Sequence, residues 1–116
     1  MTENKRTVER YMEGFRRGDH AMVLGCLADD VEWEIPGWAS LKGKEAFDRE
    51  IENPAFTGRP TITVTRLIEE NGVVVVEGAV QSQRADGGRL NAVFCDAFTM
   101  RHRKIARVIS YLVELK

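Results

Sequence analysis

The fold is decided by residues 61–83, which read TITVTRLIEENGVVVVEGAVQSQ. Residues 61–69 and 73–83 are rich in threonine, isoleucine and valine, the residue types that fit the pleated surface of a strand. Between them lies Asn71-Gly72, the strongest short hairpin signal, because both residues of such a turn adopt positive φ angles. We therefore predict two antiparallel strands joined by a tight turn.

The β pattern continues to the end of the chain. Asp86-Gly87-Gly88 predicts a second turn, which is followed by a long strand at 89–100. A turn at 101–104 then leads to a last strand at 105–115. Four consecutive strands joined by short turns predict an antiparallel meander.

The residues upstream follow helical periodicity instead. The first helix has apolar residues at i, i+3, i+4 and i+7, namely Val8, Tyr11, Met12 and Phe15. Gly18 ends this helix, and Asp19 is the expected N-cap of a second helix that continues to a break at Asp29-Asp30. The residues expected to face inward from the second helix are Met22, Val23, Cys26 and Leu27. Residues 31–35 alternate as a half-buried strand, and residues 43–53 form a third helix that ends before Pro54.

Helices followed by an antiparallel meander predict an α+β fold, with three N-terminal helices packed on one face of a curved, mostly antiparallel sheet. We expect about five or six strands in that sheet. The chain has 116 residues, so we expect a single domain that covers residues 1–116.

Composition argues against several partners. Lysine and arginine number 17 against 18 aspartate and glutamate, a net charge of -1, so we expect neither nucleic-acid nor anionic-membrane binding. The longest aliphatic run, residues 73–76, is too short to span a bilayer, and because residues 1–6 are polar we expect no secretory signal. Cys26 and Cys95 are expected to be free thiols, as in the reducing cytoplasm. His20 and His102 are isolated, so we expect no metal, and nothing predicts a cofactor.

Asp96 is the least expected residue of the predicted strands, because it lies inside the apolar run AVFCDAF at 92–98. A carboxylate is costly to bury, so Asp96 must find a partner, face a cavity or stay protonated. Tyr11, on the inner stripe of the first helix, offers a hydroxyl to the same cavity. A few polar groups in an apolar pocket are typical of a ligand or active site, so we predict Tyr11 and Asp96 as its centre. The alternative is structural: Asp96 fixes its strand, and Tyr11 is an aromatic at the edge of the core.

Strand parity indicates which side chains surround that centre. Phe94, Asp96 and Phe98 share one face of their strand, and Trp33 shares a face with Ile35. The predicted pocket lining is Phe15, Trp33, Ile35, Trp38, Phe47, Phe94, Phe98 and Ser110. The opposite face of the Asp96 strand carries Val93, Cys95, Ala97 and Thr99. This apolar outer face needs to be covered, so we expect a homodimer.

Several stretches carry a family resemblance. They are Val8-Glu9-Arg10-Tyr11, Phe15 through Gly18-Asp19, Leu27-Ala28-Asp29-Asp30-Val31, Gly43-Lys44-Glu45-Ala46, and Asp96-Ala97-Phe98 followed by Lys104-Ile105. With the order of elements, they resemble the nuclear-transport-factor-2-like superfamily, and within it SnoaL-like and ketosteroid-isomerase-like proteins. The resemblance implies a cone-shaped fold whose curved sheet wraps a deep pocket, and a dimer through the outer sheet face.

The resemblance also implies roles for residues. By position, Tyr11 matches the tyrosine donor and Asp96 the protonated aspartic acid of ketosteroid isomerases. The general base of those enzymes falls where this chain has Ile35, which cannot accept a proton, and the adjacent Glu34 points to the other face.

Two main hypotheses therefore remain open, beside a third in which the protein is an accessory domain that acts with other gene products, and whether the protein is an enzyme remains open with them. In the first, the protein binds a small, mostly apolar, oxygen-bearing molecule and supports acid-assisted isomerase, dehydratase or cyclase chemistry. In the second, it is a non-catalytic dimeric module that binds a ligand or a protein.

Overall fold

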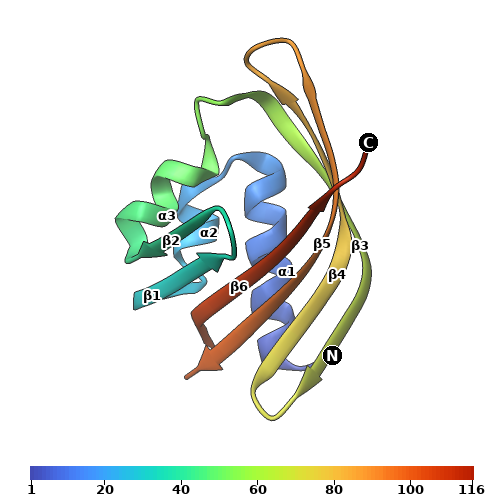
Figure 1. Ribbon diagram of the computed structural model, residues 1–116. Helices are drawn as coiled ribbons and strands as arrows, with labels where there is room; N and C mark the ends of the chain where they lie inside the picture. The colour runs from blue at the N-terminus through green and yellow to red at the C-terminus, as the bar shows by residue number, and fades with distance from the viewer.

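The computed structural model describes residues 1–116 and has the α+β architecture that the sequence predicts. A six-stranded sheet with the strand order β2-β1-β6-β5-β4-β3 curves around the first helix, which lies against its inner face (Figure 1). Strands β1 and β6 run parallel to each other, and every other neighbouring pair is antiparallel. None of the three helices is long and apolar enough to cross a membrane.

The first helix, α1 (Glu3–Arg17), begins at Thr2, whose side chain accepts a hydrogen bond from the amide of Lys5. It ends at Gly18, which has a φ of 63° in the left-handed region that favours glycine. The second helix, α2 (His20–Leu24), has Asp19 as its N-cap, as predicted. The third helix, α3 (Lys44–Ile51), lies within the predicted range.

The prediction for the end of the second helix was wrong. Helix α2 stops at Leu24, and Leu27 already begins strand β1 (Leu27–Ile35), which includes the aspartates expected to break the helix. Leu27 pairs with Ile105 of strand β6, and the Ile105 amide donates to the Cys26 carbonyl at 2.8 Å. This long-range pairing overrides the local helical pattern, although Cys26 and Leu27 are both buried, as expected.

Of the remaining strands, β2 pairs with β1 at one edge of the sheet, and β3 to β6 form a ribbon of antiparallel hairpins. They are β2 (Ala39–Lys42), β3 (Phe56–Glu70), β4 (Val73–Arg84), β5 (Arg89–Arg101) and β6 (Lys104–Glu114). Asn71 and Gly72 have φ angles of 52° and 75°, so the predicted tight turn between β3 and β4 is confirmed. Strand β2 was not predicted separately, and β3 begins before the predicted Thr61. Because β3 is an edge strand, it tolerates Pro60 within it.

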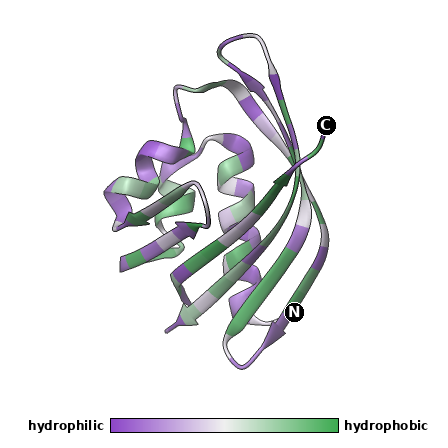
Figure 2. Ribbon diagram, in the orientation of Figure 1, coloured by the Kyte–Doolittle hydropathy of each residue, from purple (hydrophilic) through white to green (hydrophobic).

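The core lies between α1, the two shorter helices and the inner face of the sheet. Apolar and polar residues alternate along the strands, as Figure 2 shows. One contiguous cluster of 14 buried side chains fills this space, with contributions from all three helices and from strands β1, β4, β5 and β6. The predicted inner face of α1 is confirmed, since Val8, Tyr11 and Met12 are all buried in this cluster.

Candidate functional site

A cavity of about 170 Å³ lies beside the core, between α1 and the inner face of the sheet, and we call it the inner chamber. Its lining is Tyr11, Met12, Phe15, Trp33, Ile35, Ile62, Val80, Phe94, Asp96, Ser110 and Leu112. Most of these side chains are apolar, and Asp96 is the one carboxyl among them. The inner chamber therefore combines apolar walls with a small polar centre, as ligand pockets do.

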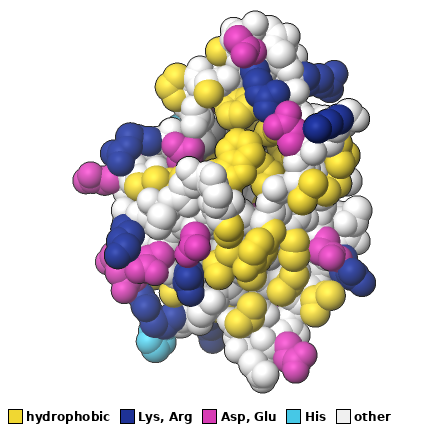
Figure 3. All heavy atoms as spheres, viewed as in Figure 1, with side chains coloured by type: hydrophobic (Ala, Val, Ile, Leu, Met, Phe, Trp, Pro, Cys, Tyr) yellow, Lys and Arg dark blue, Asp and Glu magenta, His cyan; other side chains and the backbone are white.

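A second cavity of about 440 Å³ adjoins it, and we call it the outer chamber. It lies between residues 50–54 at the end of α3, the start of β3, and strands β4 and β5. The two chambers share Phe15, Trp33, Ile62 and Val80, so they are parts of one site. In Figure 3, hydrophobic side chains gather in the hollow below the β4–β5 hairpin, which is at the top of the view.

Asp96 is buried on strand β5, with only 9% of its surface exposed. Loss of solvation raises the pKa of its carboxyl from 3.8 to about 7, while a hydrogen bond from the Ser110 hydroxyl acts in the opposite direction. Ser110 lies directly across from Asp96 on strand β6. At neutral pH the two protonation states are therefore similarly populated, so Asp96 can donate a proton or accept one.

The Ser110 hydroxyl is oriented by Trp33. The indole Nε1–H of Trp33 donates to Ser110 Oγ at 2.9 Å. The indole ring stacks on Phe47, with centroids 4.5 Å apart, and meets the edge of Phe15 at 6.0 Å. Ser110 Oγ thus accepts from Trp33 while its hydroxyl, beside Asp96, lowers the pKa of that carboxyl.

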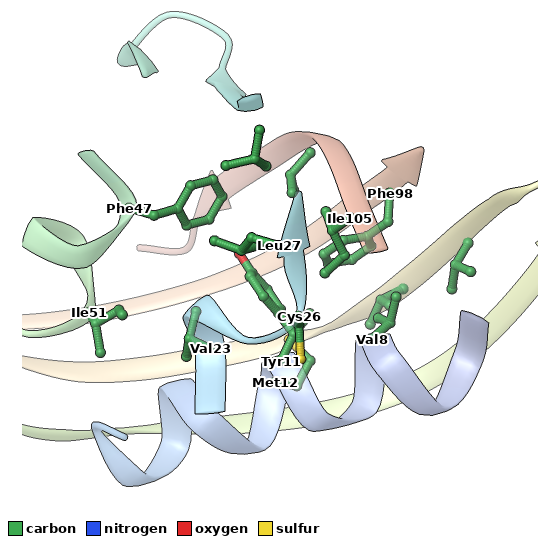
Figure 4. Close-up of a cluster of buried hydrophobic side chains, with 14 residues drawn as sticks. Val8, Tyr11, Met12, Val23, Cys26, Leu27, Phe47, Ile51, Phe98 and Ile105 are labelled. Atoms are coloured by element: carbon green, nitrogen blue, oxygen red, sulfur yellow. The ribbon is translucent and has the colours of Figure 1, made fainter. Parts of the chain in front are cut away.

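Tyr11 reaches the inner chamber from α1, and its ring lies among the buried side chains of the core (Figure 4). It makes edge-to-face contacts with Phe15 at 5.0 Å and with Phe98 at 5.2 Å. Burial raises the pKa of the Tyr11 hydroxyl well above its ordinary value, and the nearby charge of Asp96 raises it further. Tyr11 is therefore a neutral hydroxyl across the working pH range, suited to donate a hydrogen bond.

The structure brings most of the predicted site residues together. Those that line the inner chamber are Tyr11, Phe15, Trp33, Ile35, Phe94, Asp96 and Ser110. Ile35 faces the chamber, whereas the neighbouring Glu34 pairs with Arg107 at 3.2 Å. The inner chamber thus holds two titratable side chains, Tyr11 and Asp96.

Three predicted lining residues lie outside the cavity. Trp38 lies in the turn between β1 and β2, outside both strands, and is 63% exposed. Phe47 and Phe98 are fully buried in the core, where Trp33 covers Phe47 and Tyr11 packs against Phe98. Phe98 has the parity of Asp96, but the Tyr11 ring occupies the space beside it.

The sequence reasoning missed Met12, Ile62 and Val80 as lining residues of the inner chamber. Met12 belongs to the predicted inner stripe of α1, so periodicity was the available signal. Ile62 and Val80 are cross-strand partners in the β3–β4 hairpin. The tight turn at Asn71-Gly72 fixes the register of this hairpin near the turn, and a β-bulge between Val64 and Arg66 shifts it before Ile62. No signal predicted the outer chamber, because its shape depends on the path of residues 50–60 after α3.

Solved structures share this fold. An NTF2-like protein of unknown function from Burkholderia pseudomallei has a TM-score of 0.87 and 20% identity, over 97% of this chain and 92% of that chain. A LEH-like epoxide hydrolase of M. tuberculosis has a TM-score of 0.84 and 18% identity, over 96% and 83% of the two chains. TerC, co-crystallised with polyporic acid, has a TM-score of 0.82 and 23% identity, over 94% and 90%. These likenesses show that the fold is NTF2-like.

Sequence comparison adds the family. No curated protein matches the chain. The family model described as a SnoaL-like domain matches residues 8–108, which run from the inner stripe of α1 into strand β6 and include both Tyr11 and Asp96. The chain therefore belongs to the SnoaL-like domain family.

Proposed function

We propose that the protein binds a small, mostly apolar molecule with an oxygen atom at one end, and that Tyr11 and Asp96 donate hydrogen bonds to this oxygen. The observation that carries the proposal is Asp96, a carboxyl that is 9% exposed in an apolar chamber and has a pKa of about 7. Tyr11 supplies a second neutral donor in the same chamber. Two donors in a desolvated site suit a carbonyl or a developing enolate oxygen.

The chemistry that fits this pair is acid-assisted isomerisation, dehydration or cyclisation. In a dehydration, Asp96 gives its proton to a leaving hydroxyl, the C–O bond breaks and water departs. The neighbouring carbon then loses a proton, which the Asp96 carboxylate accepts. One carboxyl with a pKa of about 7 serves in both directions, so the step needs no base at Ile35.

A relative in fold supports a ligand of this kind. It is a LEH-like epoxide hydrolase, and an epoxide is an uncharged, oxygen-bearing group. The supporting evidence from this chain is the volume of about 170 Å³ in the inner chamber, which suits a compact ring system.

A matched pair of probes tests the proposal. 2-Acetylnaphthalene and 2-isopropenylnaphthalene have nearly the same shape, but only the first carries an oxygen. We expect the ketone to bind more tightly, by about tenfold, and Tyr11→Phe to reduce this preference. The preference should also decline as the pH rises through 7, and Asp96→Asn should remove that decline because an amide does not titrate there. Equal binding of the two probes, or no binding of either, contradicts the proposal.

The second candidate is a non-catalytic dimeric module, and Ile35 in the inner chamber is the observation that favours it. Here the dimer would form through the outer face of the sheet. Ile68, Val93, Tyr111 and Val113 are 40–59% exposed there, and Figure 3 shows hydrophobic side chains gathered over β6, β5 and β4. A stable dimer typically buries about 800 Å² of surface on each subunit, and an exposed apolar sheet face is the kind of surface that it buries.

Sedimentation equilibrium tests the dimer separately from the chemistry. We expect the natural protein to be dimeric and Tyr111→Lys to be monomeric with an unchanged far-UV circular dichroism spectrum. A monomeric natural protein contradicts the expected dimer. We also expect a reducing compartment such as the cytoplasm, since Cys26 and Cys95 are free thiols.

A further inference from the structure

The outer chamber bears on the charge of the ligand. Lysine, arginine and histidine are absent from the lining of both chambers, whereas Glu50 and Glu52 line the outer one. We propose that the substrate carries no anionic group, and that its outer end presents a hydrogen-bond donor or a positive charge to Glu50. This inference rests on the proposed function, because the inner end of the ligand is placed by Tyr11 and Asp96.

Glu50 is the carboxylate whose charge is left without a cationic partner. Its Oε1 accepts a hydrogen bond of 2.9 Å from Nδ2 of Asn53, and the side chain of Asn53 is a neutral amide. Glu50 takes part in no ion pair. The side chain is half-buried at the end of α3. A half-buried carboxylate with a neutral partner still attracts a cation or a strong hydrogen-bond donor.

Glu52 differs from Glu50 because it has a partner that can carry a positive charge, His20. His20 Nε2 lies 2.5 Å from Glu52 Oε1, and hydrogen bonds to Asp48 and then to Glu52 raise the pKa of His20. When His20 is protonated, its charge compensates Glu52 from outside the chamber. The charge available to a ligand in the outer chamber is therefore mainly that of Glu50.

A basic residue close in sequence to the wall of the outer chamber, Arg84, is engaged in other contacts. Arg84 follows Ser82 on β4, and it pairs with Glu114 at 3.2 Å and donates to the Arg89 carbonyl at 2.8 Å. A ligand carboxylate or phosphate in the outer chamber would have Glu50 beside it and no lining cation to offset its loss of water. Burial of an unpaired anion is strongly unfavourable, so anionic compounds are selected against.

The shape of the cavity sets how the ligand lies. The inner chamber of about 170 Å³ and the outer chamber of about 440 Å³ meet where Phe15 and Trp33 face Ile62 and Val80. A flat apolar body fits between these side chains. Its oxygen then points to Asp96, and its opposite end extends to Glu50.

Three probes test the inference. Each has the same 2-acylnaphthalene body and the same short alkyl chain on the opposite end of the ring system, ending in a hydroxyl, an ammonium or a carboxylate. We expect isothermal titration calorimetry at pH 6, where most of Asp96 is protonated, to give at least about tenfold weaker binding for the carboxylate than for the hydroxyl probe, and the tightest binding for the ammonium probe. The advantage of the ammonium probe should decrease in 0.5 M salt, because the attraction is electrostatic.

Variants identify the responsible carboxylate. Glu50→Gln should remove the advantage of the ammonium probe and leave the hydroxyl probe unchanged. Glu45→Gln, in the exposed first turn of α3, is the matched control and should change neither. If the three probes bind equally to the natural protein, this inference is overturned while the proposed function stands. If none of them binds, the proposed function is overturned and this inference with it.

Discussion

Trp33 and Ser110 are joined by a hydrogen bond of 2.9 Å from the indole Nε1 to the serine Oγ, across the parallel pair of strands β1 and β6. Ser110 lies directly across from Asp96, and its hydroxyl lowers the pKa of the carboxyl that burial raises. Because Trp33 donates to Ser110 Oγ, we expect the serine hydrogen to be directed to Asp96 and the neutral carboxyl to carry its proton on the other oxygen. In the proposed function that proton is the one offered to the ligand.

The first prediction concerns Ser110→Ala. Without the serine hydroxyl, the ionised form of Asp96 loses a hydrogen bond, so the pKa of Asp96 should rise above about 7, by about one unit or more. The pKa is measured from the pH dependence of the Asp96 carboxyl ¹³C shift. Ser82→Ala, a half-buried serine in the outer chamber, is the control. An unchanged pKa of Asp96 in Ser110→Ala would show that Ser110 does not donate to it.

The second prediction concerns Trp33→Phe, which keeps an aromatic wall but removes the indole N–H. Without the indole donor, the Ser110 hydroxyl competes better with the ligand for the Asp96 proton, so the ligand should lose part of this hydrogen bond. We expect the preference for 2-acetylnaphthalene over 2-isopropenylnaphthalene at pH 6 to fall several-fold, and the free energy of unfolding to fall by about 1–2 kcal/mol. Trp38→Phe, at a 63% exposed tryptophan, controls for the change in ring. Equal loss of affinity for both probes would indicate a change in the shape of the wall instead.

The third prediction concerns the pH dependence of stability. The pKa of Asp96 is raised from 3.8 to about 7 by folding, so the folded protein binds the proton more tightly than the unfolded chain does. The stability contributed by this proton is fully present below pH 4 and is lost as the pH rises to about 7. The loss is at most about 4 kcal/mol.

Asp96→Asn should remove this loss. Urea unfolding at pH 5 and pH 8 should therefore show that the difference in stability between Asp96→Asn and the natural protein shifts in favour of the variant at the higher pH. If the difference is the same at both pH values, Asp96 titrates normally in the folded protein, and the desolvation argument fails.

The sequence predicted the sheet better than the short elements before it. Alternation and the Asn71-Gly72 turn are local signals, and they located the β3–β4 hairpin and the strand that carries Asp96. The predicted end of α2 was wrong because Leu27 pairs with Ile105, a residue far along the chain, and this pairing outweighs the local helical period.

The same distinction, between local sequence signals and long-range packing, explains which site residues were predicted correctly. Parity placed Asp96, Phe94 and Ile35 toward the cavity, since side chains alternate along any strand. Parity could not separate a cavity wall from the core behind it. Phe98 faces the same side as Asp96 but is covered by Tyr11, and that depends on packing between two distant elements. The outer chamber follows from the path of residues 50–60, for which no periodic signal exists.

The fourth prediction concerns His20, which joins α2 to α3. Its Nδ1 lies 2.6 Å from Asp48 Oδ1 and its Nε2 lies 2.5 Å from Glu52 Oε1, and these hydrogen bonds raise the pKa of His20 in the folded protein. A raised pKa means that His20 stabilises the fold fully below the pKa of the unfolded chain, and that this stabilisation is lost as the pH rises through the folded value. His20→Gln should therefore destabilise the protein more at pH 6 than at pH 9.

Thermal unfolding of both proteins at the two pH values measures this difference. His102→Asn is the matched control, because His102 has a φ of 52° in the β5–β6 turn, a conformation that asparagine tolerates. A pH-dependent difference that appears in His102→Asn as well would not come from the contacts of His20 with Asp48 and Glu52. Asp48→Asn combined with Glu52→Gln should reproduce the His20→Gln profile, since both changes remove the same contacts. If His20→Gln lowers the melting temperature equally at pH 6 and pH 9, the imidazole joins the helices through packing and not through its charge.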